Sequence, residues 1–455
     1  GLETKLQSGG LKGPLLIMQG NGGVAHREHV SAIANLQSGP AGGMIASAYV
    51  AGLLKHQNVI TTDMGGTSFD VGLITEGYWR YAQEPIVERF RMLQPIIDIE
   101  SIGAGGGTIA LVEPETGRLL VGPRSAGASP GPVCYDAGGE QVTVTDADLA
   151  LGIIDPNYFL GGRKHLNKEK SLKAIEENIA RPLKLKVHEA AAGIYDIVNA
   201  KMSDLIRRQV VRTGYLPEEF VIYAFGGAGP VHASGFAAEL GIKQIYIFAT
   251  SPVFSAFGVA AADVIRTKVM SCQYIFPADP TVINQRLDAI ESEMKVAMTG
   301  EGFKPNQVEF RRFFTMRYRR QTAGVEMPIS WDRFNAKRMT ETQSAFEKKY
   351  EELYGVGAGY TKAGIEISEI RVDAVGKVAK PRFGARRKSK RDIKAARKGK
   401  REIFFTRPNR KFIDTPVYDY ERLGSGAVVR GPAVIELPFT TTLVPPDHKV
   451  TVDPF

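Results

Sequence analysis

The sequence predicts an α/β fold, followed by a smaller α+β part and a β-rich C-terminal segment. One region shows the β–loop–α–β order of that class. There an apolar run at Phe220–Ala224 is followed by a glycine cluster, a helix from about His232 to Leu240 and a strand at Gln244–Phe248. Two further apolar runs, Val59–Thr62 and Phe69–Ile74, flank another glycine turn, as expected of paired strands.

Composition limits the class of protein. With 455 residues, 43% of them apolar and 24% charged, we expect two or three domains of a soluble globular protein. No apolar run reaches the length of a membrane span, and two cysteines, Cys134 and Cys272, suit a reducing cytoplasm without a disulfide framework. We therefore predict a cytoplasmic protein without a membrane partner.

The net charge of +9 is concentrated in one place. Residues 377–402 hold 13 Lys or Arg and 2 acids, so this strip carries +11 and the rest of the chain −2. No aromatic ladder or nucleic-acid motif accompanies the strip, so we expect a solvated linker and no nucleic-acid partner.

The remaining elements follow from apolar spacing and from glycine or proline boundaries. In the first half, apolar spacing predicts a strand at Leu15–Gln19, a helix from the N-cap Ser38 to about Leu54, a strand at Ile97–Ile102 and a long helix at Glu189–Thr213. In the second half, it predicts helices at Leu287–Met298 and Ala336–Tyr354 and strands at Phe310–Tyr318 and Ile365–Val375. The predicted divisions are 1–270, 271–376, a basic linker at 377–402 and a β-rich segment at 403–455.

The stretch TTDMGGTSFDVGLI, residues 61–74, is the first candidate site. Backbone amides around Gly65 and Gly66 could form an anion nest, because a residue without Cβ lets phosphate oxygens approach closely. Thr67 and Ser68 could donate hydroxyl hydrogen bonds. The flanking Asp63 and Asp70 are candidate catalytic residues and Mg²⁺ ligands, while the alternative is a hairpin turn capped by aspartate.

AFGGAGP, residues 224–230, is the second candidate. Gly226, Gly227 and Gly229 offer bare backbone to a flat adenine or ribose, although the run matches neither the dinucleotide nor the P-loop pattern. The alternative is a tight turn between strand and helix. Two glycine sites and an acid pair in one α/β domain are more specific than any of them alone.

Four other residues have structural and functional readings. His232 could touch a nucleotide or cap the turn, and we favour the cap. Cys134 suits packing, since the sequence indicates no histidine partner for a nucleophile. Asp146 and Asp148 could bind a cation or cap a helix, and both options stay open.

Five motifs together resemble the hydantoinase A / 5-oxoprolinase / ketone carboxylase superfamily. In chain order they are DMGGTSFDVGLI, IGAGGGTIA, VGPRSAGASPGPVCYDAGG, TVTDADLALGIIDPNYFLGG and FGGAGPVHA. The resemblance implies an actin-like ATPase, in which two RNase H-like halves clasp ATP. It also implies that Asp63–Asp70 is the second phosphate motif and Gly226–Gly229 the adenosine motif. The first phosphate motif, a DxGGTxTD-like loop, is absent, so we expect a truncated or split chain that lacks that half.

The resemblance further implies ATP and Mg²⁺ as cofactors and two competing activities. Phe69 stands where members that open cyclic amides usually have threonine, and SPVFSAFGVAAADV looks closer to acetone or acetophenone carboxylase subunits. We therefore predict the ATP-binding subunit of a multi-subunit ketone carboxylase that activates a ketone and bicarbonate. A hydantoinase B-like large subunit and a small third subunit would be its partners. The alternatives are a cyclic amide hydrolase subunit and a non-catalytic assembly subunit.

Overall fold

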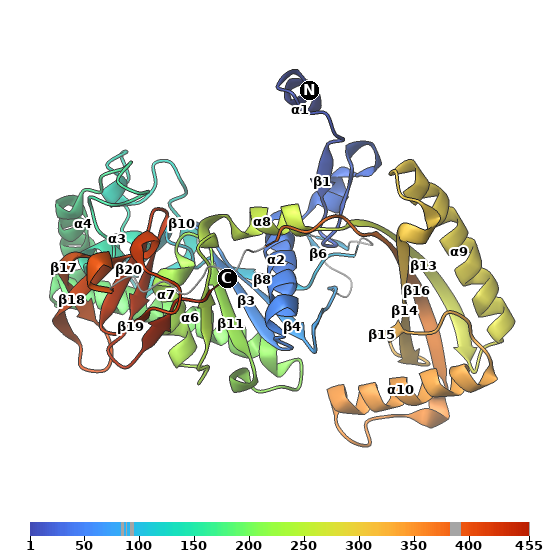
Figure 1. The fold of residues 1–455 in the computed structure, drawn as a ribbon. Coiled ribbons are helices and arrows are strands. Elements are labelled where there is room, and N and C mark those ends of the chain that lie inside the picture. The colour runs from blue at the N-terminus through green and yellow to red at the C-terminus, as the bar shows by residue number, and fades with distance from the viewer. Residues whose placement is uncertain (83–85, 88, 92–94, 383–392, 455) are drawn as a thin grey trace.

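The computed structural model describes residues 1–82, 86–87, 89–91, 95–382 and 393–454. Within these residues, two six-stranded sheets lie side by side along the molecule, and a smaller four-stranded sheet packs at the end of the first (Figure 1). Strand β11 (Val221–Phe225), helix α7 (Gly229–Ala238) and strand β12 (Ile245–Ile247) follow one another in the chain, and the two strands pair in parallel, which confirms the α/β class.

The first six-stranded sheet is mixed, in the order β12-β11-β3-β4-β5, with β8 paired to the free side of β4. Strands β12, β11 and β3 run parallel to one another, whereas β4 is antiparallel to its neighbours β3, β5 and β8. Its strands are β3 (Val59–Met64), β4 (Phe69–Thr75), β5 (Tyr78–Trp79), β8 (Ile99–Ile102), β11 (Val221–Phe225) and β12 (Ile245–Ile247). The strands predicted on both sides of each glycine turn are confirmed.

Helices cover both faces of this sheet because its strands are apolar on both sides. On one face lie α2 (Ser38–Leu54) and α8 (Phe254–Ala261), and on the other lie α6 (Val187–Val211) and α7 (Gly229–Ala238). Helices α2 and α8 touch through backbone, since a Cβ on Gly258 would lie 1.7 Å from Gly42 O. Among the described residues, no helix combines the length and apolar character needed to cross a membrane.

The second six-stranded sheet has the order β1-β2-β13-β16-β14-β15 and packs against two helices. Its elements are β1 (Leu16–Met18), β2 (Val24–His26), β13 (Val264–Phe276), β14 (Val308–Tyr318), β15 (Val325–Ile329), β16 (Ile365–Gly376), α9 (Pro280–Gly300) and α10 (Ala336–Tyr354). The predicted helices and strands after residue 280 are therefore present, and α9 begins seven residues earlier than expected. Strand β13 starts six residues before the division predicted at 270.

The junction between the two sheets is short and well bonded. Only Ala262 and Asp263 separate α8 from β13. The Asp263 carbonyl accepts a hydrogen bond from Val24 N (2.9 Å), and its carboxylate accepts from Val378 N (3.0 Å) and Lys380 Nζ (2.5 Å). Three segments far apart in the sequence therefore meet at one residue.

The C-terminal sheet has the order β17-β18-β20-β21 and packs against α7 and α3. It consists of β17 (Arg397–Phe405), β18 (Lys411–Asp419), β20 (Ala433–Leu437) and β21 (Thr440–Val444). The described part of the basic strip is not all linker, because β17 begins at Arg397 and pairs with β18 along its length. Residues 383–392 of the strip lie outside the described residues.

The other elements are short. They are α1 (Leu2–Ser8), α3 (Val144–Ala150), α4 (Lys168–Ile175), α5 (Arg181–Leu183), and the strand pairs β6 (Ile86–Val87) with β7 (Phe90–Arg91), β9 (Thr108–Val112) with β10 (Leu119–Ser125), and β19 (Val428–Arg430) with β22 (Lys449–Thr451). One predicted cap is wrong. Ser38 is the first residue of α2, and Gln37 is the N-cap with φ 56°.

Candidate functional site

Two glycine runs support each other at the end of β3. Gly106 N donates to Gly65 O (3.0 Å) and Gly107 N donates to Gly66 O (2.6 Å). A Cβ on Gly105 would lie 2.5 Å from the carbonyl carbon of Gly66, so the run at 103–107 packs backbone to backbone on the turn. The turn carbonyls are thereby occupied.

The turn amides are left available. Gly65 N donates to Ser68 O (3.2 Å), which closes the turn. In the described part of the chain, Gly66 N and Thr67 N have no hydrogen-bond partner, and both residues are exposed. Adjacent unpaired N–H groups in a turn are the arrangement that binds anions.

The second predicted glycine loop joins the first at the end of β3. Ala228 N donates to Met64 O (3.0 Å), and Gly226 has φ 81°, which favours glycine. A Cβ on Gly226 would also lie 2.3 Å from Met64 O. Gly229 is the first residue of α7, so Gly227 lies between the strand and the N-terminus of that helix.

These turns line one cavity of about 350 Å³, which is within the range of small-molecule pockets. The predicted residues Gly65, Gly66, Thr67 and Gly227 line it. The rest of the wall comes from segments that the sequence did not bring together, including Gly106, Gly107, Tyr135, Thr145, Asp148, Asp155, Tyr158, Phe159, Phe439 and Thr440. Glycine backbone therefore meets aromatic side chains in one pocket.

The aspartates lie behind the turn, outside the lining of this cavity. Asp63 and Asp70 are opposite each other across β3 and β4, so both side chains are on the α2/α8 face. Asp63 Oδ2 accepts from Ser255 Oγ of α8 (3.0 Å). Asp70 accepts from Ser68 Oγ (3.4 Å) and from Ser101 Oγ.

Burial shifts both carboxyls. It raises the pKa of Asp63 to about 6, against a smaller lowering by the Ser255 hydroxyl, and the Asp70 charge raises it further. Burial also raises the pKa of Asp70, against the lowering by Ser101 and Ser68. The pair therefore ionises reluctantly, as like charges in a desolvated site do.

No cation of the described chain neutralises the pair. Within the described ranges neither Asp63 nor Asp70 forms an ion pair, and no cluster of three or more His, Cys, Asp or Glu side chains could hold a metal alone. Two carboxylates suit Mg²⁺, which takes one or two from protein and completes its shell with water and phosphate oxygens. The residues present therefore fit this ion.

Phe69 belongs to the opposite face of the hairpin. Its ring is fully buried and lies 5.4 Å from the ring of Phe236 in α7. Met64, its partner across the strands, is equally buried. The choice of substrate class from Phe69 thus has no support in a direct contact, because the side chain is part of the core.

The aspartates of α3 have separate roles. Thr143 is the N-cap of this helix, and Asp146 completes its capping box, so capping is the correct alternative for Asp146. Its carboxylate also accepts from Val133 N (3.2 Å) and Cys134 N (2.8 Å). Burial raises the pKa of the Cys134 thiol, which agrees with packing and not with a nucleophile.

His232 is not a cap. It is fully buried in α7, with Nε2 3.3 Å from Asp148 Oδ2 and Nδ1 3.2 Å from Asn199 Nδ2. Its ring stacks on Tyr195 with centroids 4.8 Å apart. This cluster could not be predicted from the sequence, because its members come from three separate helices.

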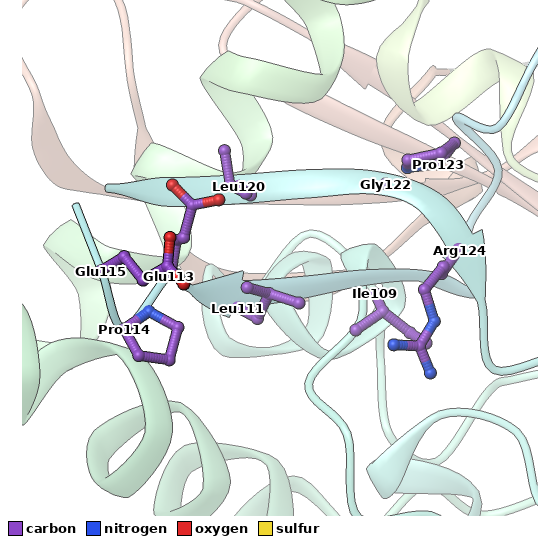
Figure 2. A pocket seen from close by; sticks show the side chains of 9 residues that line it. All are labelled: Ile109, Leu111, Glu113, Pro114, Glu115, Leu120, Gly122, Pro123 and Arg124. Carbon is purple, nitrogen blue, oxygen red and sulfur yellow. The ribbon is translucent and has the colours of Figure 1, made fainter. Parts of the chain in front are cut away.

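A second cavity, of about 480 Å³, lies over the β9–β10 pair (Figure 2). Ile109, Leu111 and Leu120 form its apolar surface, with Glu113 and Glu115 at one end and Arg124 at the other. The two glutamates would repel phosphates from their end of this cavity.

Fold and site together define an α/β protein whose β3–β4 hairpin carries a glycine turn with unpaired amides among the described residues and an acid pair. The sequence matches the hydantoinase/oxoprolinase family over residues 1–268 and the C-terminal domain of that family over residues 278–455. The chain belongs to the hydantoinase/oxoprolinase family, as the five motifs predicted.

Relatives of known function fall into two groups. The acetophenone carboxylase gamma subunit of Aromatoleum aromaticum is 36% identical over 99% of this chain and 62% of its own length. The solved ATP-dependent caprolactamase from Pseudomonas jessenii is 32% identical, with a TM-score of 0.89 over 100% of this chain and 66% of its own. Nucleotide-free acetone carboxylase is 29% identical, with a TM-score of 0.81 over 100% and 65%. The chain thus spans slightly less than two thirds of the acetophenone and acetone carboxylase subunits that it matches.

Proposed function

We propose that this chain is the ATP-binding subunit of a multi-subunit, ATP-dependent ketone carboxylase of the acetone or acetophenone type. The observation that carries this proposal is the β3–β4 hairpin, which offers unpaired amides at its turn and an unneutralised acid pair behind it. Relatives that use ATP, among them acetone carboxylase and caprolactamase, support the nucleotide.

The chain's own groups divide the work. Gly66 N and Thr67 N would bind phosphate oxygens and stabilise charge on the transferred phosphoryl group. Asp63 and Asp70 would hold Mg²⁺, which neutralises phosphate charge when bound. The aromatic residues of the cavity, such as Tyr158 and Phe159, would pack against the nucleoside.

An actin-like arrangement is part of the proposal. The mixed sheet supports it, because the antiparallel β3–β4 hairpin is extended, on the other side of β3, by the parallel strands β11 and β12. In such a fold ATP lies between two halves, so groups outside this chain would complete the phosphate site. We also propose a hydantoinase B-like large subunit and a small third subunit as partners in the cytoplasm, with the ketone and bicarbonate reacting on the large subunit.

A cyclic amide hydrolase is the second candidate. The TM-score of 0.89 with caprolactamase, against 0.81 with acetone carboxylase, favours it. The identity of 36% with an acetophenone carboxylase subunit favours the carboxylase. Both reactions start with phosphorylation of a substrate oxygen, so the site described above serves either.

The test uses the purified complex with ATP and labelled bicarbonate. Acetone, acetophenone, caprolactam and 5-oxoproline are supplied in turn, and label fixation and ATP consumption are both measured. Label fixed only with a ketone supports the carboxylase, whereas ring opening without fixation replaces it by the amide hydrolase. If no ATP is consumed with any of the four substrates, both enzymatic proposals are contradicted and an assembly role is left.

A further inference from the structure

Asp148 is a buried acid whose carboxylate is only half satisfied. It lies on α3 (Val144–Ala150), its side chain is 2% exposed, and it lines the glycine-lined cavity. Oδ2 is 3.3 Å from His232 Nε2, but Oδ1 has no hydrogen-bond partner in the described part of the chain. An unpaired buried carboxylate oxygen is unfavourable, so a donor from the cavity would stabilise it.

The neighbouring side chains determine which carboxylate oxygen of Asp148 is left unpaired. Asn199 Nδ2 donates to Tyr195 O (2.8 Å), which sets the orientation of the amide. The same amide nitrogen is 3.2 Å from His232 Nδ1, so that ring nitrogen accepts. Nε2 is then the ring nitrogen that donates a hydrogen bond to Asp148 Oδ2. Oδ1 therefore remains as an acceptor of fixed position.

The position of α3 relates Asp148 to the phosphate-binding turn. Thr145 Oγ1 donates to Gly106 O (2.8 Å), and Gly106 N binds the turn at Gly65 O. Asp148 is three residues further along the helix, which is about 4.5 Å of axial rise. A ligand with its phosphates on the turn would thus place the group attached to them near Asp148, and a second anion there would be repelled.

We propose that Asp148 Oδ1 binds a neutral O–H or N–H donor of the nucleoside part of the ligand and so selects a nucleotide over a bare polyphosphate. The proposal rests on the proposed function, because it assumes that phosphates bind at Gly66 and Thr67. His232 is a positioning residue here, since it acts only through the carboxylate. Ribose hydroxyls and the amino group of adenine share this donor chemistry.

The isosteric variant Asp148→Asn tests it. His232 Nε2 needs an acceptor, so the amide oxygen would stay beside it and the NH₂ group would take the place of Oδ1. A donor would then face a donor. We expect affinity for ATP to fall by about tenfold or more, the effect of losing a hydrogen bond to a charged group. Affinity for inorganic tripolyphosphate should be unchanged or higher, because a negative charge is removed.

Binding is measured by calorimetry on the full-length protein in its purified complex, with Mg²⁺ present. Asp155→Asn is the matched charge control, because Asp155 lines the same cavity but lies 3.4 Å from Arg401. In that control ATP and tripolyphosphate should change together. Equal weakening of both ligands by Asp148→Asn, or no weakening of ATP, would overturn the proposal. Wild-type protein that binds neither ligand would instead overturn the proposed function.

Nucleotide analogues identify the donor. We compare 2′-deoxy-ATP, 3′-deoxy-ATP and ITP, which lack one ribose hydroxyl or the amino group. The analogue without the bound donor should bind wild-type protein as weakly as ATP binds Asp148→Asn, and the substitution should weaken its binding no further. If the substitution weakens all three analogues as much as it weakens ATP, Asp148 contacts none of these groups and the assignment fails.

Discussion

Each of the two six-stranded sheets carries a pair of buried or half-buried acids, and the two pairs are neutralised differently. In the second sheet, Arg371 lies between Asp373 and Glu326 and over the rings of Tyr81 and Phe313. In the first sheet, the side-chain hydrogen bonds that Asp63 and Asp70 accept from described residues come from serine hydroxyls.

The difference separates an acid pair that serves the fold from one that serves a ligand. The second sheet supplies its own cation, which is 3% exposed and therefore fixed in place. The first sheet leaves two desolvated carboxyls with raised pKa and no counter-charge from the described residues. A site in that condition gains most when a cation from outside arrives.

The largest effect on stability is expected from Arg371, which neutralises Asp373 and Glu326 in the second sheet. Arg371→Met removes the charge but keeps most of the length of the side chain, and leaves Asp373 buried and unpaired. We expect the free energy of unfolding to fall by about 3–5 kcal/mol, as for other broken buried ion pairs. Urea denaturation measures it, with Arg311→Met as the control, because Arg311 pairs with Glu309 on the surface. Equal losses in the two variants would show that the buried pair has no special role.

For the acid pair Asp63 and Asp70, we expect the main effect to be on enzymatic activity. Asp70→Asn removes one proposed metal ligand, so we expect ATP consumption to fall by about 100-fold or more while the complex still assembles. Turnover is measured with saturating Mg²⁺, and assembly by gel filtration. Asp204→Asn, which changes an exposed acid of α6, serves as control. Near-normal turnover with Asp70→Asn would remove this residue from the site.

The contribution of Asp63 to the stability of the protein should depend on pH. Burial raises the pKa of the Asp63 carboxyl from its ordinary 3.8 to about 6 in the folded protein, so the folded protein loses stability as the pH rises through that range. Asp63→Asn lacks this loss. Without ATP and Mg²⁺, we expect the variant to be more stable than wild type by about 2 kcal/mol at pH 7 and about equal at pH 4. The measurement is denaturation at both pH values, and a constant difference between them would contradict the raised pKa.

The smallest effect concerns the far side of the same hairpin. Phe69→Leu should lower the free energy of unfolding by about 1 kcal/mol, because one core apolar side chain replaces another. The ratio of kcat/KM between ketone and lactam substrates should not change. Phe236→Leu, on the other partner of the ring contact, should give the same result. A shift of this kcat/KM ratio with Phe69→Leu, but not with Phe236→Leu, would show that Phe69 influences the choice of substrate.

The hairpin could be predicted closely from the sequence because its signals are local. Alternating apolar residues define β3 and β4, and glycines define the turn between them. The same period of two places Asp63 and Phe69 on opposite faces, a consequence that the sequence interpretation of Phe69 overlooked. The misplaced cap at Ser38 has a local cause too, since a left-handed Gln37 precedes it.

The wall of the cavity could not be predicted because it is assembled over long distances. Gly106, Asp148, Tyr158 and Phe439 lie on four segments, and only tertiary packing brings them to the turn. The one usable signal was the run TVTDADLA, where two acids stand within an otherwise uncharged helix. Choosing between Asp146 and Asp148 required the hydrogen bonds that only the structure gives.

The junction at Asp263 connects the helix that contacts Asp63 directly to the second sheet. Ser255, which contacts Asp63, lies near the start of α8, and two residues after this helix the chain enters β13. Eight helical residues span about 12 Å, whereas thirteen strand residues span about 43 Å. Two residues, with Asp263 held by hydrogen bonds from Val24, Val378 and Lys380, therefore join the helix that contacts Asp63 to a strand more than three times as long, which extends the connection into the second sheet.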